Sequence, residues 1–245
     1  MENIKDALEY AVELAGNEQK IIQDDEGKEF YDRNKFSLSE LNPKKYPDAL
    51  KVRTLTGLIN YLTEDHTIDG LSDEKLIIHV KDPETVVMYT ELDEEQKRKT
   101  FMIAQAQLPS FDYGRFHSVE QFNIKLQSIF IKTEERDLLL QFSSAISIDN
   151  GAKVEDNGVA QTTTIRNGVS TMSNAVAPNP VTLKPFRTFT EVDQPESDFV
   201  FRLNKDAELA LFEADGGIWK NEAMIAIKDY LEENLKQFDN IQIIA

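Results

Sequence analysis

The sequence is most constrained near its C-terminus, where a strand, a tight turn and a helix follow one another. Two β-forming runs, Asp198–Leu203 and Glu208–Phe212, precede the tetrapeptide Ala-Asp-Gly-Gly, and a helical pattern then extends over Trp219–Leu235. Glycine adopts left-handed backbone conformations without a clash from a Cβ atom. Gly216 and Gly217 therefore predict a close chain reversal over the end of the second strand, in a corner that either positions chemistry or only packs.

Strand and helix signals continue on the N-terminal side of this corner and beyond it. A hairpin is predicted from Leu76–Val80 and Thr85–Tyr89, a third strand over Lys99–Gln107 and a terminal strand over Ile241–Ile244. Prolines restrict the extended stretch Val181–Phe189 to an edge strand or a crossing segment. Apolar residues at helical spacing predict helices over residues 2–15, over Thr54–Asp65 and after Ser118, where Gln121 completes a capping box. Aromatic residues around Gly114 predict a corner that covers a sheet edge.

The stretch Thr133–Ile146 is ambiguous between helix and strand. Thr133 can cap a helix, but Arg136, three residues later, does not complete a capping box. We favour a strand through Asp137–Phe142.

Composition shifts most between about residues 150 and 175, which are rich in Asn, Gly, Ser and Thr. A β-forming run, Val159–Ile165, lies between the pairs Asn157-Gly158 and Asn167-Gly168. Asn-Gly is the strongest short signal for a hairpin turn, so we expect a projecting β-ribbon here. The alternative is a mobile functional loop.

Together these patterns predict an α+β protein with a mainly antiparallel sheet packed by helices. We expect residues 1–65 to form a helical N-terminal extension and arm, and residues 66–245 to form the core domain that carries the ribbon. The arm, Asp32–Leu50, should be ordered but irregular, because Pro43 and Pro47 interrupt any regular element.

Charge and cysteine content narrow the function classes. The chain has 44 acidic against 27 basic residues and a formal charge of −17, which repels phosphate backbones and argues against indiscriminate coating of DNA. It has no cysteine, so it has no disulfide, thiolate nucleophile or cysteine-based zinc site. The sequence has no secretory signal pattern and no run that approaches the roughly 20 apolar residues of a membrane span. We therefore expect a soluble cytoplasmic protein with no membrane partner.

The motifs of common enzyme classes are missing from the sequence. There is no GxxxxGK[ST] phosphate loop, GxGxxG fingerprint, HExxH metal helix or GxSxG nucleophile elbow. The three histidines, His66, His79 and His117, are far apart and none has a histidine four residues on. No catalytic residue, metal site or cofactor is predicted, which favours a non-enzymatic function. The rival hypothesis is nucleotide hydrolysis with acidic residues holding Mg²⁺.

Three arginines are candidates for binding an anionic partner: Arg187 between two phenylalanines, Arg202 inside a strand and Arg166 on the predicted ribbon. A rigid arginine can bind a phosphate or carboxylate through two hydrogen bonds, or it can close an internal ion pair. For these arginines the internal partner would be Glu191, Asp193 or Asp198. Asp215 either caps the last helix or orients a ligand. The full set of candidate binding residues is Arg166, Arg187, Arg202, Asp215, Gly216, Gly217 and Trp219.

Several long motifs resemble a known family. PNPVTLKPFRTFTEVDQPESDFVFRL and ALFEADGGIWKNEAMIAIKDYL, with LPSFDYGRFHSVEQFNIKLQSIF and GVAQTTTIRNGV earlier in the chain, resemble the uncharacterised YfdQ-like family of phage and prophage proteins. The resemblance runs from Ala49 to the C-terminus and is most specific in the last third. The positions that carry it most clearly are Arg187, Pro195, Phe212, Glu213, Asp215, Gly216, Gly217 and Trp219. It implies a phage or prophage origin and expression in the cytoplasm of the bacterial host, but no established activity and no catalytic residues.

We expect a non-enzymatic phage protein that assembles into a homo-oligomer. The first helix, the arm and the ribbon are three extensions that a compact monomer does not need, and each could reach a neighbouring copy. The alternative is an accessory protein of phage DNA metabolism or counter-defence, which would bind a nucleotide or nucleic acid through the three arginines.

Overall fold

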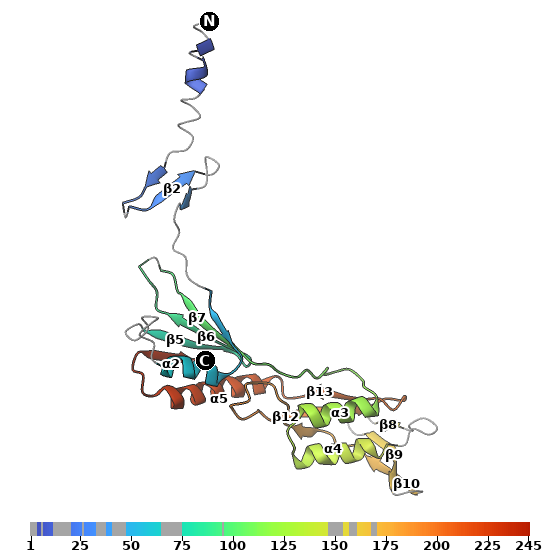
Figure 1. Ribbon diagram of the computed structural model, residues 1–245. Coiled ribbons are helices and arrows are strands. Elements are labelled where there is room, and N and C mark those ends of the chain that lie inside the picture. The colour runs from blue at the N-terminus through green and yellow to red at the C-terminus, as the bar shows by residue number, and fades with distance from the viewer. Residues whose placement is uncertain are drawn as a thin grey trace. The chain divides into compact units, whose positions relative to one another are not determined.

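The computed structural model describes most of the chain, and Figure 1 labels many of its elements. The described residues are 4–5, 7–11, 21–25, 27–32, 38–40, 48–64, 75–94, 96–146, 154–156, 161–167 and 171–245. The chain divides into two compact units, Met1–Pro47 and Asp48–Ala245, which we call the N-terminal unit and the C-terminal unit.

The N-terminal unit contains a helical segment and a small sheet. Residues 4–5 and 7–11 are helical, as the apolar spacing predicted. Strands β1 (Ile21–Gln23), β2 (Glu29–Asp32) and β3 (Leu38–Glu40) pair in that order, both times antiparallel. Strand β3 lies inside the arm that we expected to be irregular. A strand of three residues is too short to show the alternation by which a strand is recognised in a sequence.

The C-terminal unit begins with a mixed five-stranded sheet in the order β14-β5-β6-β7-β4. The hairpin of β5 (Leu76–Asp82) and β6 (Thr85–Thr90) and the third strand β7 (Thr100–Gln105) are antiparallel neighbours, as predicted. Each edge is closed by a short parallel strand, β4 (Leu50–Val52) beside β7 and β14 (Ile241–Ile244) beside β5. The α+β class is therefore confirmed, but the main sheet is mixed.

Two helices cover one face of this sheet. Helices α2 (Leu55–Thr63) and α5 (Ile218–Leu235) pack against each other and against the sheet, as Figure 1 shows. The register places Ile78, Met88 and Met102 in one row across β5, β6 and β7, and all three side chains are buried on the face that meets the helices. We call this hydrophobic cluster the sheet core; its helical members are Leu55, Leu58, Ile59, Leu62, Ile227, Leu231 and Leu235.

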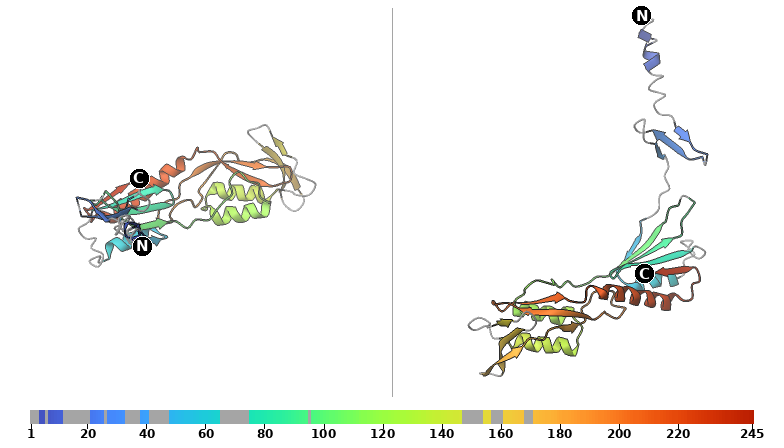
Figure 2. Two further views of the ribbon diagram at one scale, coloured as in Figure 1. Left: turned by 90° about the horizontal axis from the view of Figure 1, so that it is seen from above. Right: turned by 180° about the vertical axis from the view of Figure 1, so that it is seen from behind.

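A second sheet and two helices form the other half of the unit. Strands β11 (Val181–Leu183), β12 (Ser197–Leu203) and β13 (Leu209–Glu213) are antiparallel, with β11 as the predicted edge strand. Helices α3 (Val119–Ile129) and α4 (Glu134–Ser144) lie side by side on this sheet (Figure 2). Their shared cluster, which we call the aromatic core, includes the fully buried rings of Phe122, Phe130, Phe199 and Phe201.

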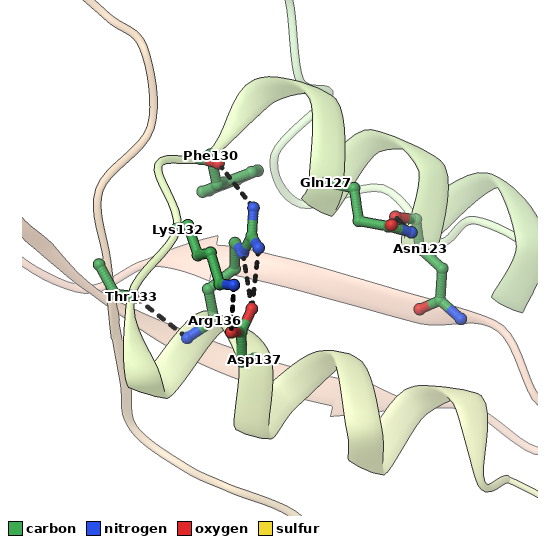
Figure 3. Close-up of polar contacts among 7 residues, drawn as sticks. All are labelled: Asn123, Gln127, Phe130, Lys132, Thr133, Arg136 and Asp137. Atoms are coloured by element: carbon green, nitrogen blue, oxygen red, sulfur yellow. Dashed lines mark hydrogen bonds and ion pairs between the residues drawn. The ribbon is translucent and has the colours of Figure 1, made fainter.

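The prediction of a strand through Asp137–Phe142 is wrong, because this segment is helix α4. Thr133 is its N-cap and accepts a hydrogen bond from the Arg136 amide at 3.1 Å. The Arg136 side chain donates to the Phe130 carbonyl and to Asp137, which fixes the turn between α3 and α4 (Figure 3). Acidic residues in the first turn favour a helix through its dipole, so a helix forms although the capping box is incomplete.

The predicted aromatic corner and the predicted ribbon are both present. Gly114 has φ +75° and donates its amide to the Leu211 carbonyl at 2.8 Å, so the corner covers the edge of β13. In the ribbon, β9 (Gln161–Asn167) pairs antiparallel with β8 (Val154–Asp156) and β10 (Thr171–Val176). The buried Gln161 amide group exchanges two hydrogen bonds with the Leu203 backbone, which attaches the ribbon to the end of β12. The two expected turn pairs include residues outside the described part of the chain.

The chain divides at a different point from the one we expected. We placed the end of the N-terminal extension at residue 65, whereas the compact units separate after Pro47. Helix α2 belongs to the C-terminal unit because its buried face, including Leu55 and Leu58, is part of the sheet core.

Candidate functional site

The glycine corner forms as predicted between β13 and α5. Gly216 and Gly217 have φ values of +65° and +82°, and α5 begins directly after them. Gly217 is the N-cap and has no side-chain cap. Asp215 instead holds the turn before the helix, because its Oδ1 accepts the Gly217 amide at 2.9 Å and its Oδ2 accepts the Ser197 hydroxyl. The carboxylate that we expected to cap a helix or orient a ligand is thus already engaged in the turn.

These contacts shift the pKa of Asp215. Partial burial acts to raise it, but hydrogen bonds from Ser197 and Gly217 and the nearby charge of Arg187 act more strongly together. The net result is a pKa below the usual aspartate value, so the carboxylate stays ionised into the acidic range.

Arg187 lies at the centre of the site, in a cage of aromatic rings. Its guanidinium carbon is 4.6 Å from the ring centroid of Trp219, 5.0 Å from that of Phe199 and 5.1 Å from that of Tyr113. Only 6% of the side chain is exposed. Cation–π contacts of this kind stabilise a guanidinium most when it is withdrawn from water.

The polar partners of Arg187 all lie along one side of the guanidinium. Its Nη1 donates to the Ser197 hydroxyl at 3.1 Å and is 3.3 Å from Oε1 of Glu213. Among the described residues, its Nε and Nη2 atoms are buried and have no hydrogen-bond partner. One edge of a buried cation is therefore left with two unsatisfied donors.

The internal ion pair that we expected for Arg187 exists, but the predicted partners are wrong. The partner is Glu213 rather than Glu191, Asp193 or Asp198. The register pairs Glu213 with Phe199, one of the three cage residues, so strand pairing brings the carboxylate to the guanidinium. Cross-strand neighbours of this kind cannot be recognised from sequence spacing.

A cavity of about 750 Å³ opens beside the caged arginine. Arg187, Tyr113 and Trp219 line it together with the β5–β6 turn. Its charged lining residues are Asp82, Glu84, Glu213, Arg187 and Lys220.

Tyr113 forms part of both the cage and the cavity wall. Burial raises the pKa of its hydroxyl, although the charge of Arg187 acts in the opposite direction. The phenol therefore stays neutral at physiological pH, and it cannot supply a negative charge to balance the arginine.

Gln194 organises the loop that carries Arg187, and no pattern in the sequence points to this role. Its Oε1 accepts the backbone amides of Arg187 at 2.8 Å and Thr188 at 3.1 Å, and its Nε2 donates to the Phe189 carbonyl at 2.9 Å. Thr188 in turn donates its hydroxyl to the Pro83 carbonyl at 2.6 Å. A single buried glutamine thus fixes the backbone on either side of the caged arginine.

The structure brings together only some of the predicted site residues. Arg187, Asp215, Gly217 and Trp219 are linked by the contacts described above, and Gly216 lies within the same turn. Arg202 is five residues from Ser197 on β12, so the two side chains point to opposite faces of the sheet. The Nη1 atom of Arg202 donates to the Phe201 carbonyl.

The third arginine, Arg166, lies on ribbon strand β9, opposite Met172. The three arginines come from different elements and do not share the cage, so a nucleotide or nucleic-acid partner held by all three stays a prediction.

Comparisons with known proteins add no relative to these observations. No protein-family model, curated protein or solved structure matches the chain, so the resemblance to the YfdQ-like family stays a prediction. In the described ranges, histidines and acidic residues do not gather into a group of three or more that could hold a metal ion. Across the same ranges, no helix combines the length and the apolar character needed to cross a bilayer.

Proposed function

We propose that this chain is a non-enzymatic protein that assembles with copies of itself, in a phage-infected bacterium as the resemblance implies. The observation that supports this most directly is the exposure of the N-terminal unit's apolar side chains, as far as the structure describes them. Wherever the burial of a side chain is described in this unit, the side chain is exposed or half-buried. The apolar side chains of Ile4, Leu8, Tyr10 and Ile22 are between 46% and 67% exposed.

A unit of this kind needs a partner surface. Its three strands have three, four and three residues. Such a sheet is stable only with a packed hydrophobic face, and below about 70 residues a single core rarely suffices without disulfides, a metal or oligomerisation. The chain has no cysteine, which leaves association as the simplest source of stability.

The helical segment favours a second copy of the same chain as that partner. Ile4, Leu8 and Ala11 are spaced by four and then three residues, which is the spacing of a coiled-coil seam. A narrow apolar seam pairs well with an identical seam, and a closed symmetric assembly follows when all copies pair alike. Lys5 and Glu9, 3.9 Å apart on the same segment, are highly exposed and keep the rest of its surface polar.

The main sheet offers a further apolar surface. Helices α2 and α5 both pack on one face, whereas Ile77, Tyr89 and Ile103 point to the other face and are only half-buried. An apolar sheet face that helices of its own unit leave uncovered is a common site of protein association.

The mass of the protein in solution tests the proposal. We expect the full-length chain at micromolar concentration to form an assembly whose mass is two or more times the chain mass of 28.0 kDa. A variant with Ile4→Glu and Leu8→Glu, or a chain beginning at Asp48, should shift toward the monomer mass. The control Lys5→Gln changes the charge of the same helix by one unit without touching the seam, so it should keep the assembly.

Results of two kinds would contradict the proposal. The first kind concerns mass: a full-length chain that stays at its monomer mass of 28.0 kDa, or an assembly that survives loss of the N-terminal unit. The other concerns catalysis: metal-dependent turnover of a nucleotide that Asp215→Asn abolishes would show an enzyme.

A further inference from the structure

We propose that the unsatisfied edge of Arg187 binds one carboxylate group of a small ligand that occupies the adjacent cavity. This inference does not depend on self-assembly, because every residue in it belongs to the C-terminal unit. It begins from a buried charge whose hydrogen bonds are incomplete.

The state of Arg187 is unusual for a protein interior. Buried polar atoms nearly always have hydrogen-bond partners, and a buried charge needs them most. Arg187 is 6% exposed, and only its Nη1 has polar partners in the described part of the chain. The three rings of the cage hold the guanidinium in place, but no hydrogen bond from the described residues reaches its Nε or Nη2 atom.

The geometry of a guanidinium identifies the missing group. The Nε–H bond and one Nη2–H bond project from the same edge of the plane, parallel to each other. Their separation matches that of the two oxygens of a carboxylate, and this side-on pairing is the bidentate contact for which arginine is suited. The two atoms without partners in Arg187 are these two.

The cavity provides room for the rest of the ligand. Its volume of about 750 Å³ lies within the range of small-molecule sites, and Tyr113, Phe111 and Trp219 supply aromatic walls. Because Nε and Nη2 are buried, a ligand reaches them only when a neighbouring side chain moves. Glu213, the ion-pair partner of Nη1, borders the same cavity and has a side chain that is 42% exposed.

The charges around the cavity select a monocarboxylate over a phosphate. Asp82, Glu84 and Glu213 bring three negative charges, and Arg187 and Lys220 bring two positive charges. Asp215 adds another negative charge next to Ser197. A dianionic phosphate would be repelled, whereas a ligand with one carboxylate and an otherwise neutral or cationic body, such as an α-amino acid, suits this distribution.

The test uses the full-length protein and the fluorescence of Trp219. The chain has one tryptophan, and its ring lies 4.6 Å from the guanidinium carbon. We would titrate the common L-α-amino acids, propionate and benzoate separately into the protein. Inorganic phosphate would be titrated in the same way, as the competing class of ligand. We expect at least one monocarboxylate to give a saturable change, with a downfield shift of the Arg187 Nε–H proton in NMR spectra. Phosphate should bind at least tenfold more weakly.

Three variants assign the effect to the proposed edge. Arg187→Lys keeps the charge but loses the side-on pair of donors, so affinity should fall tenfold or more. Arg202→Lys makes the same change on the other face of β12 and should leave affinity unchanged. Glu213→Gln keeps an oxygen that can accept from Nη1, so the variant should fold. It should bind the monocarboxylate more tightly because a competing negative charge is gone.

Several outcomes would overturn the proposal. One is that no monocarboxylate binds the wild-type protein saturably. Another is that phosphate binds as tightly as the best monocarboxylate, and a third is that Arg187→Lys keeps the wild-type affinity. If Arg187→Lys fails to fold, Glu213→Gln decides the question. A Glu213→Gln variant that binds the monocarboxylate no more tightly than the wild type would overturn the proposal.

Discussion

Replacement of Gln194 by alanine should destabilise the C-terminal unit more than any exposed glutamine replacement. The side chain is 4% exposed and is the acceptor for two backbone amides, those of Arg187 and Thr188. A buried amide that loses its acceptor costs about 1–3 kcal/mol, so the two together cost about 2–6 kcal/mol. Domains are stable by only about 5–15 kcal/mol, so this loss is a large fraction of the total.

Urea unfolding followed by Trp219 fluorescence measures this loss, because the reporter ring belongs to the same site. The matched control is Gln127→Ala on α3. That side chain is exposed and makes one hydrogen bond, to the Asn123 carbonyl at 3.0 Å, so its loss should change stability by less than about 0.5 kcal/mol. A Gln194→Ala variant within about 1 kcal/mol of the wild type would refute the reasoning, since it would mean that the loop finds other acceptors at no cost.

Three smaller predictions concern the glycine corner and the start of α4. Thr133→Ala removes the N-cap of α4 and should cost about 1 kcal/mol in urea unfolding, whereas Thr133→Ser should cost much less; equal losses would argue against capping. Gly217→Val forces a side chain into a backbone conformation with φ +82° and should cost about 1–2 kcal/mol or more, with Gly217→Asn milder because asparagine tolerates this region. The depressed pKa of Asp215 stabilises the fold above the aspartate pKa of the unfolded chain, about 3.9, and this stability is lost as the pH falls through the folded value. Asp215→Asn should therefore be less stable than the wild type at pH 7 and approach it below about pH 4, and a difference that does not change with pH would contradict this.

Elements whose sequence carries a strong local pattern were predictable. The glycine corner was predicted because only glycine accepts its positive φ values without cost, and both φ values are positive in the structure. Helix α2 was predicted from four apolar positions on one face, and all four are buried. The hairpin of β5 and β6 followed from two β-forming runs around a turn centred on Pro83.

Features that depend on distant partners were not predictable. Helix α4 has a weak apolar pattern. We discounted Thr133 as its cap because Arg136 does not complete a capping box, but the threonine caps the helix without one. The parallel pairing of β14 with β5 joins segments more than 150 residues apart, which no local pattern can register. The contact of Arg187 with Glu213 depends on the register of β12 and β13, and the role of Gln194 depends on the path of a loop.

The position of Arg187 connects the two halves of the C-terminal unit. Val181 and Leu183 belong to the aromatic core, whereas Phe189 and Val192, a few residues later, belong to the sheet core. The caged arginine lies on the segment that passes from one core to the other. Its own backbone is held by Gln194, and its neighbour Thr188 is bonded to the β5–β6 turn.

A ligand on the free edge of Arg187 would therefore bind where both cores depend on the same short loop. Satisfying two buried donors there would favour the folded arrangement of the whole unit, because a ligand that binds only the native state stabilises it by mass action. At ten times its dissociation constant such a ligand adds about 1.4 kcal/mol, which is comparable to a lost helix cap. A site placed at this junction thus couples occupancy of the cavity to the stability of the contact between the two halves.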